Sequence, residues 1–239
     1  MPTNVILIHG AFADSTSWEG VIPKLVGLGH RVIAWANPLR SVAGDAAALT
    51  SLVRSLDGPV LLVGHSYGGA VMTNVPRDAG DIVGLVYVAG FALEQNESAG
   101  DAASLAPGST LAETLQPVPL ADGGVDVYIL QEGYHAQFAA DLPAEQAAVM
   151  AVTQRPVTQT ALSEPSGATP LWRTVPSWFI FGELDRNIPA GAHHVMAVRA
   201  NSQHTVEIPG ASHVVGISHP DAIVQVIAQA SGSRSSVDA

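Results

Sequence analysis

Six short apolar runs, each separated from the next by a longer segment, constrain the fold of this chain more than any other feature. The runs are nearly continuous in Val, Ile and Leu, which is typical of strands buried on both faces of a parallel sheet. They lie at residues 5–8, 31–36, 60–63, 82–88, 178–181 and 205–208. Helices are predicted between and after them, at residues 18–28, 43–56, 69–77, 190–200 and 220–230. The alternation predicts a doubly wound α/β fold with a mainly parallel six-stranded sheet.

The stretch from 91 to 174 interrupts this alternation. It has no comparable apolar run, Pro and Gly recur in it, as in "LQPVPLADGGVD", and one helix is predicted at residues 144–153. We therefore expect residues 1–90 and 175–239 to form the core and residues 91–174 to form a lid (cap) inserted after the fourth strand.

Composition narrows the classes of partner. A chain of 239 residues can bury one sizeable core, and 47% hydrophobic against 13% charged residues indicates a packed domain. The net charge of -11, with ten scattered Lys and Arg, disfavours nucleic-acid binding. No apolar stretch is long enough to span a bilayer, and the amino terminus lacks the features of a signal peptide. We expect a cytoplasmic protein whose partner is a neutral small molecule rather than a nucleic acid or a membrane.

The segment "VLLVGHSYGGAVM" at residues 60–72 joins an apolar strand to a helical stretch through Gly-x-Ser-x-Gly. Such a bend forces its apex, Ser66, into a strained conformation and requires small neighbours, which Gly64 and Gly68 provide. The bend exposes the Ser66 hydroxyl at the carboxyl end of the sheet and directs the Tyr67 amide toward the group it attacks. The alternative is a packing turn without chemistry. Phosphate-binding loops are disfavoured because neither Gly-Lys-Ser/Thr nor Gly-x-Gly-x-x-Gly is present.

A nucleophilic serine needs a base and a carboxylate that orients it. Asp185 follows the fifth predicted strand in "ELDRNIP", and His213 follows the sixth in "ASHVVG". The order Ser66, Asp185, His213 is the order found in nucleophile-elbow enzymes. Asp185 has two competing interpretations: it could cap the next helix, or Glu183 could be the orienting acid instead.

The oxyanion of the reaction needs a second backbone donor. The first strand ends at His9-Gly10, and the loop "AFADSTSW" follows. Gly10 lets the backbone turn beneath the site, so the amide of Ala11 is the predicted donor, with that of Phe12 as the alternative.

The remaining histidines suggest structure rather than chemistry. His9 and His65 flank glycines in the core and are expected to hold loops by hydrogen bonds, while His193 and His194 are adjacent on a helix and cannot both face one ligand. There is no cysteine and no His-Glu-x-x-His pattern, so neither a thiolate nor a metal is implied.

Aromatic side chains are few, and several lie in the predicted lid or in the loop after the first strand. We expect pocket-lining residues among Phe12, Trp18, Phe91, Tyr128, Phe138 and Trp172. The alternative for each is simple packing of the lid on the core.

These segments together resemble the alpha/beta-hydrolase family: His9-Gly10, "GHSYGG", "GELDRNIP" and "GASHVV" occur in that family's order. "HGAFADSTSW" is further similar to small bacterial esterases, plant methyl-salicylate esterases and hydroxynitrile lyases. Such lyases carry threonine where Gly10 stands and lysine where Val214 stands, so cyanohydrin cleavage is disfavoured and Val214 is expected beside the substrate.

The resemblance implies six parallel strands with the first two swapped in space, and acyl transfer without a cofactor. Ser66 would attack an ester, His213 would act as base and acid, Asp185 would orient His213, and the Ala11 and Tyr67 amides would hold the oxyanion. The expected activity is a carboxylesterase acting on small neutral esters with water. Family members that are lactonases (including acyl-homoserine lactonases), cofactor-free perhydrolases or non-enzymatic receptors leave those alternatives open.

Overall fold

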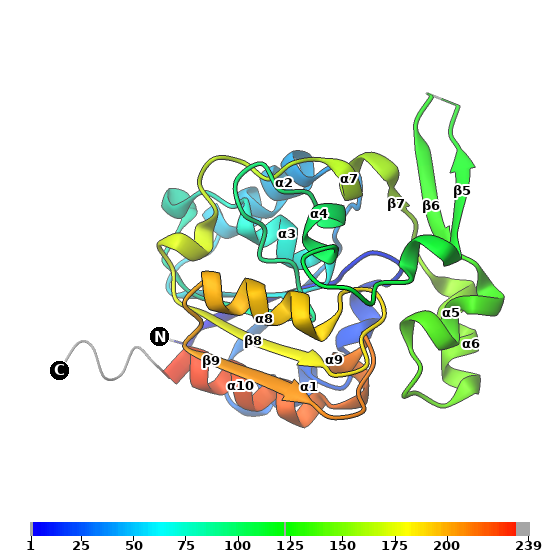
Figure 1. Ribbon diagram of the computed structural model, residues 1–239. Helices are drawn as coiled ribbons and strands as arrows, with labels where there is room; N and C mark the ends of the chain where they lie inside the picture. Colours follow the sequence, from blue (N-terminus) through cyan, green and yellow to red (C-terminus); the bar gives the residue numbers. More distant parts are fainter. Residues whose placement is uncertain (1, 122, 233–239) are drawn as a thin grey trace.

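A six-stranded parallel sheet forms the centre of the computed structural model, which describes residues 2–121 and 123–232 (Figure 1). The strand order is β2-β1-β3-β4-β8-β9, and every neighbouring pair is parallel. The strands are β1 (Asn4–Ile8), β2 (Arg31–Trp35), β3 (Val60–His65), β4 (Ile82–Val88), β8 (Ser177–Gly182) and β9 (His204–Ile208). The predicted fold class is confirmed, including the exchanged positions of the first two strands.

The central strands supply most of the core. Every residue of β1, β3 and β8 is buried, whereas the edge strands β2 and β9 are partly exposed. Burying one Val, Leu or Ile side chain contributes about 1.5–3 kcal/mol. The loops that follow β1, β3 and β8 therefore start from the most firmly packed part of the molecule.

Helices cover both faces of the sheet. Figure 1 shows α2, α3 and α8 above the sheet and α1 and α10 below it. The helices of the core are α1 (Ile22–Gly27), α2 (Val42–Arg54), α3 (Tyr67–Thr73), α8 (Ala190–Arg199), α9 (Val215–Ser218) and α10 (Pro220–Gly232), with 3-10 turns η1 (Ser15–Trp18) and η2 (Arg77–Ala79). Residues 233–239 of the predicted core range lie outside the described residues.

Two helices differ from the prediction. The predicted helix at 18–28 is split into η1 and α1, and Pro23 occupies the first turn of α1, where its missing N–H is no loss. The helix predicted to end at residue 77 is α3, which ends at Thr73. Pro76 explains the early end, because a proline disfavours helical backbone at the residue before it.

The segment between β4 and β8 contains more regular structure than expected. It comprises α4 (Ala99–Ala103), η3 (Leu111–Thr114), β5 (Leu115–Pro119), β6 (Val125–Ile129), α5 (Gln131–Phe138), α6 (Ala144–Thr153), β7 (Val157–Thr158), α7 (Gln159–Ser163) and η4 (Leu171–Arg173). β5, β6 and β7 form a separate antiparallel sheet, which was not predicted. β5 escaped prediction because it is a largely exposed edge strand carrying Pro117 and Pro119.

This segment lies at the carboxyl end of the main sheet. In Figure 1 the arrowheads of β8 and β9 point toward the side that carries α5, α6 and the hairpin of β5 and β6. Gln137 donates to Asn187 Oδ1 over 2.7 Å, Ser212 donates to Asp141, and the Tyr134 hydroxyl donates to the Phe12 carbonyl over 2.8 Å. Side chains of α5 and of the loop before α6 therefore bind the loops that follow β1, β8 and β9.

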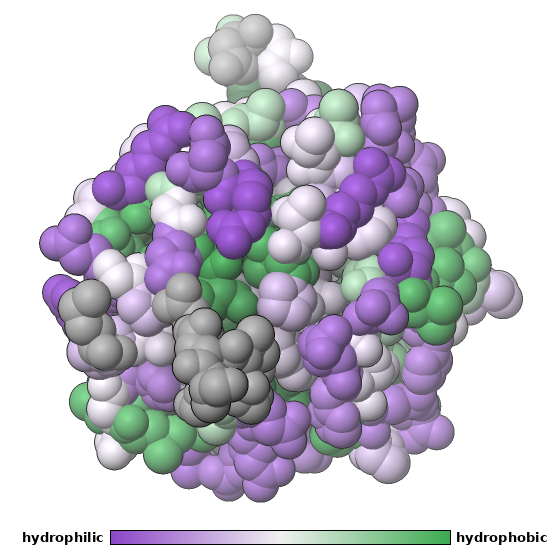
Figure 2. Space-filling view, turned by 90° about the vertical axis from the view of Figure 1, so that its left-hand side faces the viewer, coloured by the Kyte–Doolittle hydropathy of each residue, from purple (hydrophilic) through white to green (hydrophobic). Residues whose placement is uncertain are grey.

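The side that lies on the left in Figure 1 is mainly hydrophilic. Figure 2 shows hydrophilic side chains over most of it, with smaller hydrophobic patches between them. None of the helices within the described residues combines the length and the apolar character needed to cross a bilayer. The cytoplasmic location stays a prediction.

Candidate active site

Ser66 occupies a sharp turn between the end of β3 and the start of α3. Its backbone φ of 52° and ψ of -123° are rare for a residue with a side chain, and such strained residues concentrate at functional sites. The turn is held by its neighbours: the Ser66 amide donates to Val88 O over 3.2 Å, and the amides of Gly69 and Phe91 donate to Ser66 O over 2.9 and 3.1 Å. The strain is thus offset by hydrogen bonds from two adjacent segments.

Glycines around this turn are required by close backbone contacts. A Cβ added at Gly68 would lie 2.4 Å from the Ile8 carbonyl oxygen, and one at Gly64 would lie 2.7 Å from the Gly69 amide nitrogen. The Gly-x-Ser-x-Gly pattern therefore reflects helix α3 packing directly against the ends of β1 and β3.

The Tyr67 side chain anchors the start of α3 from the other direction. Its hydroxyl donates to Asp45 Oδ2 on α2 over 2.9 Å, in a buried position. Burial, reinforced by the Asp45 carboxylate, raises the pKa of the Tyr67 hydroxyl above its ordinary value, so it stays a donor. The Tyr67 amide is therefore held in place through both its side chain and its helix.

Asp185 and His213 meet in turns that follow β8 and β9. Asp185 Oδ2 lies 2.7 Å from His213 Nδ1, and both side chains are fully buried. Asp185 Oδ1 accepts hydrogen bonds from the amides of Asn187 and Ile188 over 2.8 and 2.9 Å.

Burial alone would raise the pKa of Asp185. The charge interaction with His213 and hydrogen bonds from both nearby histidines outweigh burial and lower that pKa below its usual range. Asp185 is thus an ionised acceptor.

The alternatives to Asp185 have other positions. Glu183 is exposed and its Oε2 accepts the Gly210 amide over 2.9 Å. The residue that precedes α8 is Pro189, so Asp185 is not the residue at the start of that helix. The carboxylate that the structure brings to His213 is Asp185.

The loops bearing Ser66 and His213 are in contact. His65, directly before Ser66, has its Nε2 3.1 Å from the His213 carbonyl oxygen, and the two rings lie 4.8 Å apart. Because a carbonyl oxygen only accepts, Nε2 of His65 carries the hydrogen. Burial lowers the pKa of His65 to about 3, so the ring is neutral.

His213 Nε2 is buried and has no hydrogen-bond partner among residues 2–121 and 123–232. It is thus free to accept a hydroxyl proton.

The backbone donors beside Ser66 differ in availability. The Phe12 amide donates to the Arg155 carbonyl oxygen over 3.1 Å, so it is already engaged. Ala11 and Tyr67 line the same cavity as Ser66, and neither amide donates a hydrogen bond within the described part of the chain. This arrangement favours the Ala11 amide over that of Phe12 as an oxyanion donor.

Ser66 opens into a cavity of about 610 Å³. Its wall comes mainly from the segment between β4 and β8, and none of the described residues that line it carries a charge. They are Ala11, Phe12, Ser66, Tyr67, Phe91, Ala99, Gly100, Ala103, Ser104, Ser109, Leu111, Ala112, Leu115, Pro117, Val127, Gln159, Leu162, Ser163, Asn187 and Ile188. A neutral, largely apolar ligand matches this surface.

Five of the residues predicted to line the pocket lie in or beside the site. Phe12 and Phe91 line the cavity. The ring of Phe138 lies 5.1 Å from that of His213. Trp18 and Val214 line a separate small cavity of about 10 Å³ next to His65. Phe12 and Phe91 can contact a ligand. Phe138, Trp18 and Val214 instead support the loops that carry His65 and His213.

Two of the residues predicted among the pocket-lining members, Tyr128 and Trp172, are not part of the wall of this cavity. Tyr128 is next to Val127 on β6; Val127 lines the cavity, and successive residues of a strand point to opposite faces. Trp172 is buried in η4, where its indole N–H donates to the Leu93 carbonyl oxygen over 2.9 Å and Arg173 lies against its ring.

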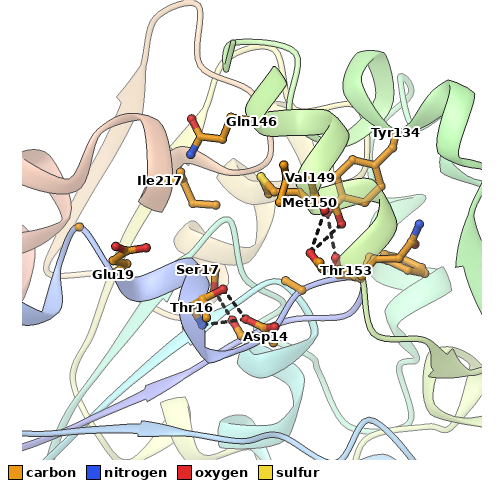
Figure 3. A pocket seen from close by; sticks show the side chains of 14 residues that line it. Asp14, Thr16, Ser17, Glu19, Tyr134, Gln146, Val149, Met150, Thr153 and Ile217 are labelled. Carbon is orange, nitrogen blue, oxygen red and sulfur yellow. Dashed lines mark hydrogen bonds between the residues drawn. The ribbon is translucent and has the colours of Figure 1, made fainter. Parts of the chain in front are cut away.

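Phe12 also lines a second cavity, of about 650 Å³. Figure 3 shows Asp14, Thr16, Ser17 and Glu19 along one side of it and Tyr134, Gln146, Val149, Met150 and Thr153 along the other. Ser66 does not line it. In the described ranges, no group of three or more His, Asp or Glu side chains is placed to hold a metal ion.

A parallel sheet of this order, with a serine on a strained turn between the third strand and the following helix, is the architecture of an alpha/beta hydrolase. The chain belongs to the alpha/beta hydrolase family, whose sequence profile matches residues 5–226. The family resemblance inferred from the sequence is therefore confirmed.

Individual relatives agree with this assignment. The carbendazim hydrolyzing esterase of Nocardioides sp. (strain SG-4G) is 32% identical over 108 residues, which are 40% of this chain and 45% of that esterase. The chain is thus aligned to less than half of that relative's length. Among solved structures, polyneuridine aldehyde esterase has a TM-score of 0.81 at 17% identity, covering 97% of this chain and 100% of that one. The methylesterase MES16 from Arabidopsis has a TM-score of 0.77 at 16% identity, covering 95% and 98%.

Proposed function

We propose that this protein hydrolyses neutral carboxylic esters through an acyl-enzyme formed on Ser66. The observation that carries the proposal is the buried Asp185–His213 pair. Nε2 of His213 has no hydrogen-bond partner among the described residues, and the loop of His213 contacts the loop of Ser66. Esterase names among the relatives support the same reaction class.

In the proposed reaction the Ser66 oxygen adds to the ester carbonyl carbon while its proton passes to Nε2 of His213. The negative oxygen that forms is held by the Ala11 and Tyr67 amides. The carbon–oxygen bond to the alcohol then breaks, and His213 returns the proton to the leaving oxygen. Water repeats the cycle on the acyl-enzyme, releasing the acid and restoring Ser66. Asp185 keeps the hydrogen of His213 on Nδ1 and stabilises the charged imidazole.

The cavity indicates the substrate class. Its volume lies within the range of about 300–1,000 Å³ that holds drug-sized ligands, and its described wall is uncharged. A carboxylate or ammonium group would lose its hydration there without gaining a charged partner. We therefore propose neutral esters, from short-chain esters up to this size, as substrates. Residues 91–174 would act as the lid, because they supply most of the wall.

The test is an assay of 4-nitrophenyl esters of increasing acyl length with wild type and Ser66→Ala. Removing a nucleophile of this type costs about 10⁶-fold in kcat, so Ser66→Ala should be inactive. Ser104→Ala is the matched control, because Ser104 lines the same cavity and its hydroxyl donates to the Gly100 carbonyl of the adjacent helix α4. Equal activity in wild type and Ser66→Ala would refute the proposal. The same panel should contain lactones, and a preference for lactones over open-chain esters would replace the substrate class while keeping the mechanism.

A further inference from the structure

A second buried imidazole contacts the orienting carboxylate. His193 Nε2 lies 3.3 Å from Asp185 Oδ2, the same oxygen that is 2.7 Å from Nδ1 of His213. The side chains of all three residues are fully buried. No step of the proposed reaction uses His193.

The surroundings of His193 determine which of its nitrogens carries hydrogen. Its ring stacks on Phe181, with centroids 4.6 Å apart and planes 16° from parallel. An ionised carboxylate oxygen only accepts, so Nε2 of His193 must be the protonated, donating nitrogen. Nδ1 has no hydrogen-bond partner within the described residues, and burial lowers the pKa of His193, so the ring is neutral.

Asp185 thereby accepts four hydrogen bonds, two at each oxygen. The amides of Asn187 and Ile188 hold Oδ1, while His193 and His213 share Oδ2. Without His193, Oδ2 would keep only the imidazole that it has to orient.

We propose that His193 is a positioning residue: it donates Nε2–H to Asp185 and holds the carboxylate in the orientation that aligns His213. This inference rests on the proposed function, because it takes His213 as the base. His193 comes from α8, Asp185 from the turn after β8 and His213 from the turn after β9, so one carboxylate joins three elements.

The same geometry predicts an effect on the pH dependence of activity. The titratable groups facing His193 are Asp185, His213 and the neighbouring His194, which pairs with Glu207 at the surface, while His65 faces His213. Two imidazoles that share one oxygen compete for it, so removing His193 leaves Oδ2 entirely to His213. The protonated, inactive form of this cluster then persists to higher pH.

Variants at position 193 test the proposal on a 4-nitrophenyl ester. His193→Leu removes the donor, His193→Gln keeps an N–H donor, and His194→Gln alters the exposed neighbour on the same helix. We expect His193→Leu to lower kcat about 10-fold, which is similar to the loss when a residue that orients a metal-binding side chain through a hydrogen bond is removed. KM should change less than kcat, and the acid limb of the kcat/KM profile should move to higher pH. His193→Gln should recover most of kcat, and His194→Gln should match wild type. An unchanged kcat and pH profile in His193→Leu, or equal losses in the Leu and Gln variants, would overturn the proposal.

A measurement on the unaltered protein covers a variant that fails to fold. With ¹⁵N-labelled histidine, NMR of the wild-type protein at pH 7 should show the hydrogen of His193 on Nε2 and a bare Nδ1. A hydrogen on Nδ1 would overturn the proposal. Ser66→Ala assayed in parallel separates the two hypotheses: full activity of that variant refutes the ester-hydrolase mechanism, whereas the ring nitrogen that carries hydrogen reports on His193 alone.

Discussion

Gly10 packs so closely against Ser66 that a Cβ at position 10 would lie 2.6 Å from the Ser66 Cβ and 2.9 Å from the His65 carbonyl oxygen. The loop that carries the Ala11 amide and the turn that carries Ser66 therefore pack directly against each other at Gly10, which has no side chain. Any side chain at position 10 must push these two parts of the site apart.

Gly10→Ala should consequently lose oxyanion stabilisation while the sheet stays intact. Loss of one oxyanion donor costs about 10²- to 10³-fold in kcat, and we expect a loss of that order in ester hydrolysis. Gly27→Ala is the control, because within residues 2–121 and 123–232 no atom outside its chain neighbours and its own helix backbone lies within 4 Å of a Cβ at that position. It should keep full activity. A fully active Gly10→Ala would show that the Ala11 loop does not contribute to catalysis.

Asp185→Asn tests the orienting acid against its neighbour. An amide of the same shape cannot stabilise the charged imidazole of His213, and the equivalent change in another serine hydrolase lowers kcat about 10⁴-fold. Glu183→Gln should retain wild-type activity, since the Glu183 side chain is exposed and accepts the Gly210 amide, a bond that a glutamine oxygen can also accept. If Glu183→Gln lost activity and Asp185→Asn kept it, Glu183 would be the functional acid.

Stability should decline on mild acidification because of buried neutral histidines, among them His9 and His65. Burial lowers the pKa of His9 to about 4 and that of His65 to about 3. Nε2 of His9 already accepts from Asn37, so a proton there would break a hydrogen bond. Unfolded histidines titrate near 6.5, and below that pH the unfolded chain therefore binds protons that the folded chain excludes.

The free energy of unfolding should be largest above about pH 6.5 and fall by about 1.4 kcal/mol per pH unit for each histidine down to its folded pKa. Urea denaturation at pH 7, 6 and 5 measures this slope. His65→Asn should reduce it, whereas His204→Gln, at an exposed position on β9, should leave it unchanged. A flat dependence from pH 7 to pH 5 would contradict the buried neutral state of both rings.

Filling the cavity should change substrate size preference. Ala103 lies on α4 and lines the cavity with Ser66, so Ala103→Trp would place a large ring in that space. Hydrolysis of long-chain 4-nitrophenyl esters should fall relative to that of the acetate. Leu105→Trp, at an exposed site just after α4 that does not line the cavity, should keep the wild-type ratio. Equal acetate-to-long-chain ratios in wild type and Ala103→Trp would place the substrate elsewhere.

The sheet and the loops around Ser66, Asp185 and His213 were predictable because each residue follows an apolar run. Such runs mark buried parallel strands, and the carboxyl ends of parallel strands share one edge. Asp185 was predicted as the orienting acid with Glu183 as the alternative, because spacing alone does not show which of two carboxylates two residues apart the turn directs toward His213. That direction depends on the Asn187 and Ile188 amides.

The cavity wall was less predictable than the sheet. Tyr128 and Val127 are adjacent on β6, and only the pairing of β6 with its neighbours decides which one faces Ser66. Small residues such as Ala103 carry no signal that distinguishes a cavity wall from ordinary packing. For His193 a signal was available: it shares a helical face with Met196 and Ala197, which are buried, whereas His194 faces solvent.

The most direct test of the central claim is covalent labelling of the folded protein with a fluorophosphonate, followed by mass spectrometry of the intact chain and of its peptides. The account predicts one adduct per chain, located on Ser66, absent from Ser66→Ala and formed much more slowly in His213→Ala. A chain that folds normally yet forms no adduct at Ser66, or an adduct that persists unchanged in Ser66→Ala, would contradict it.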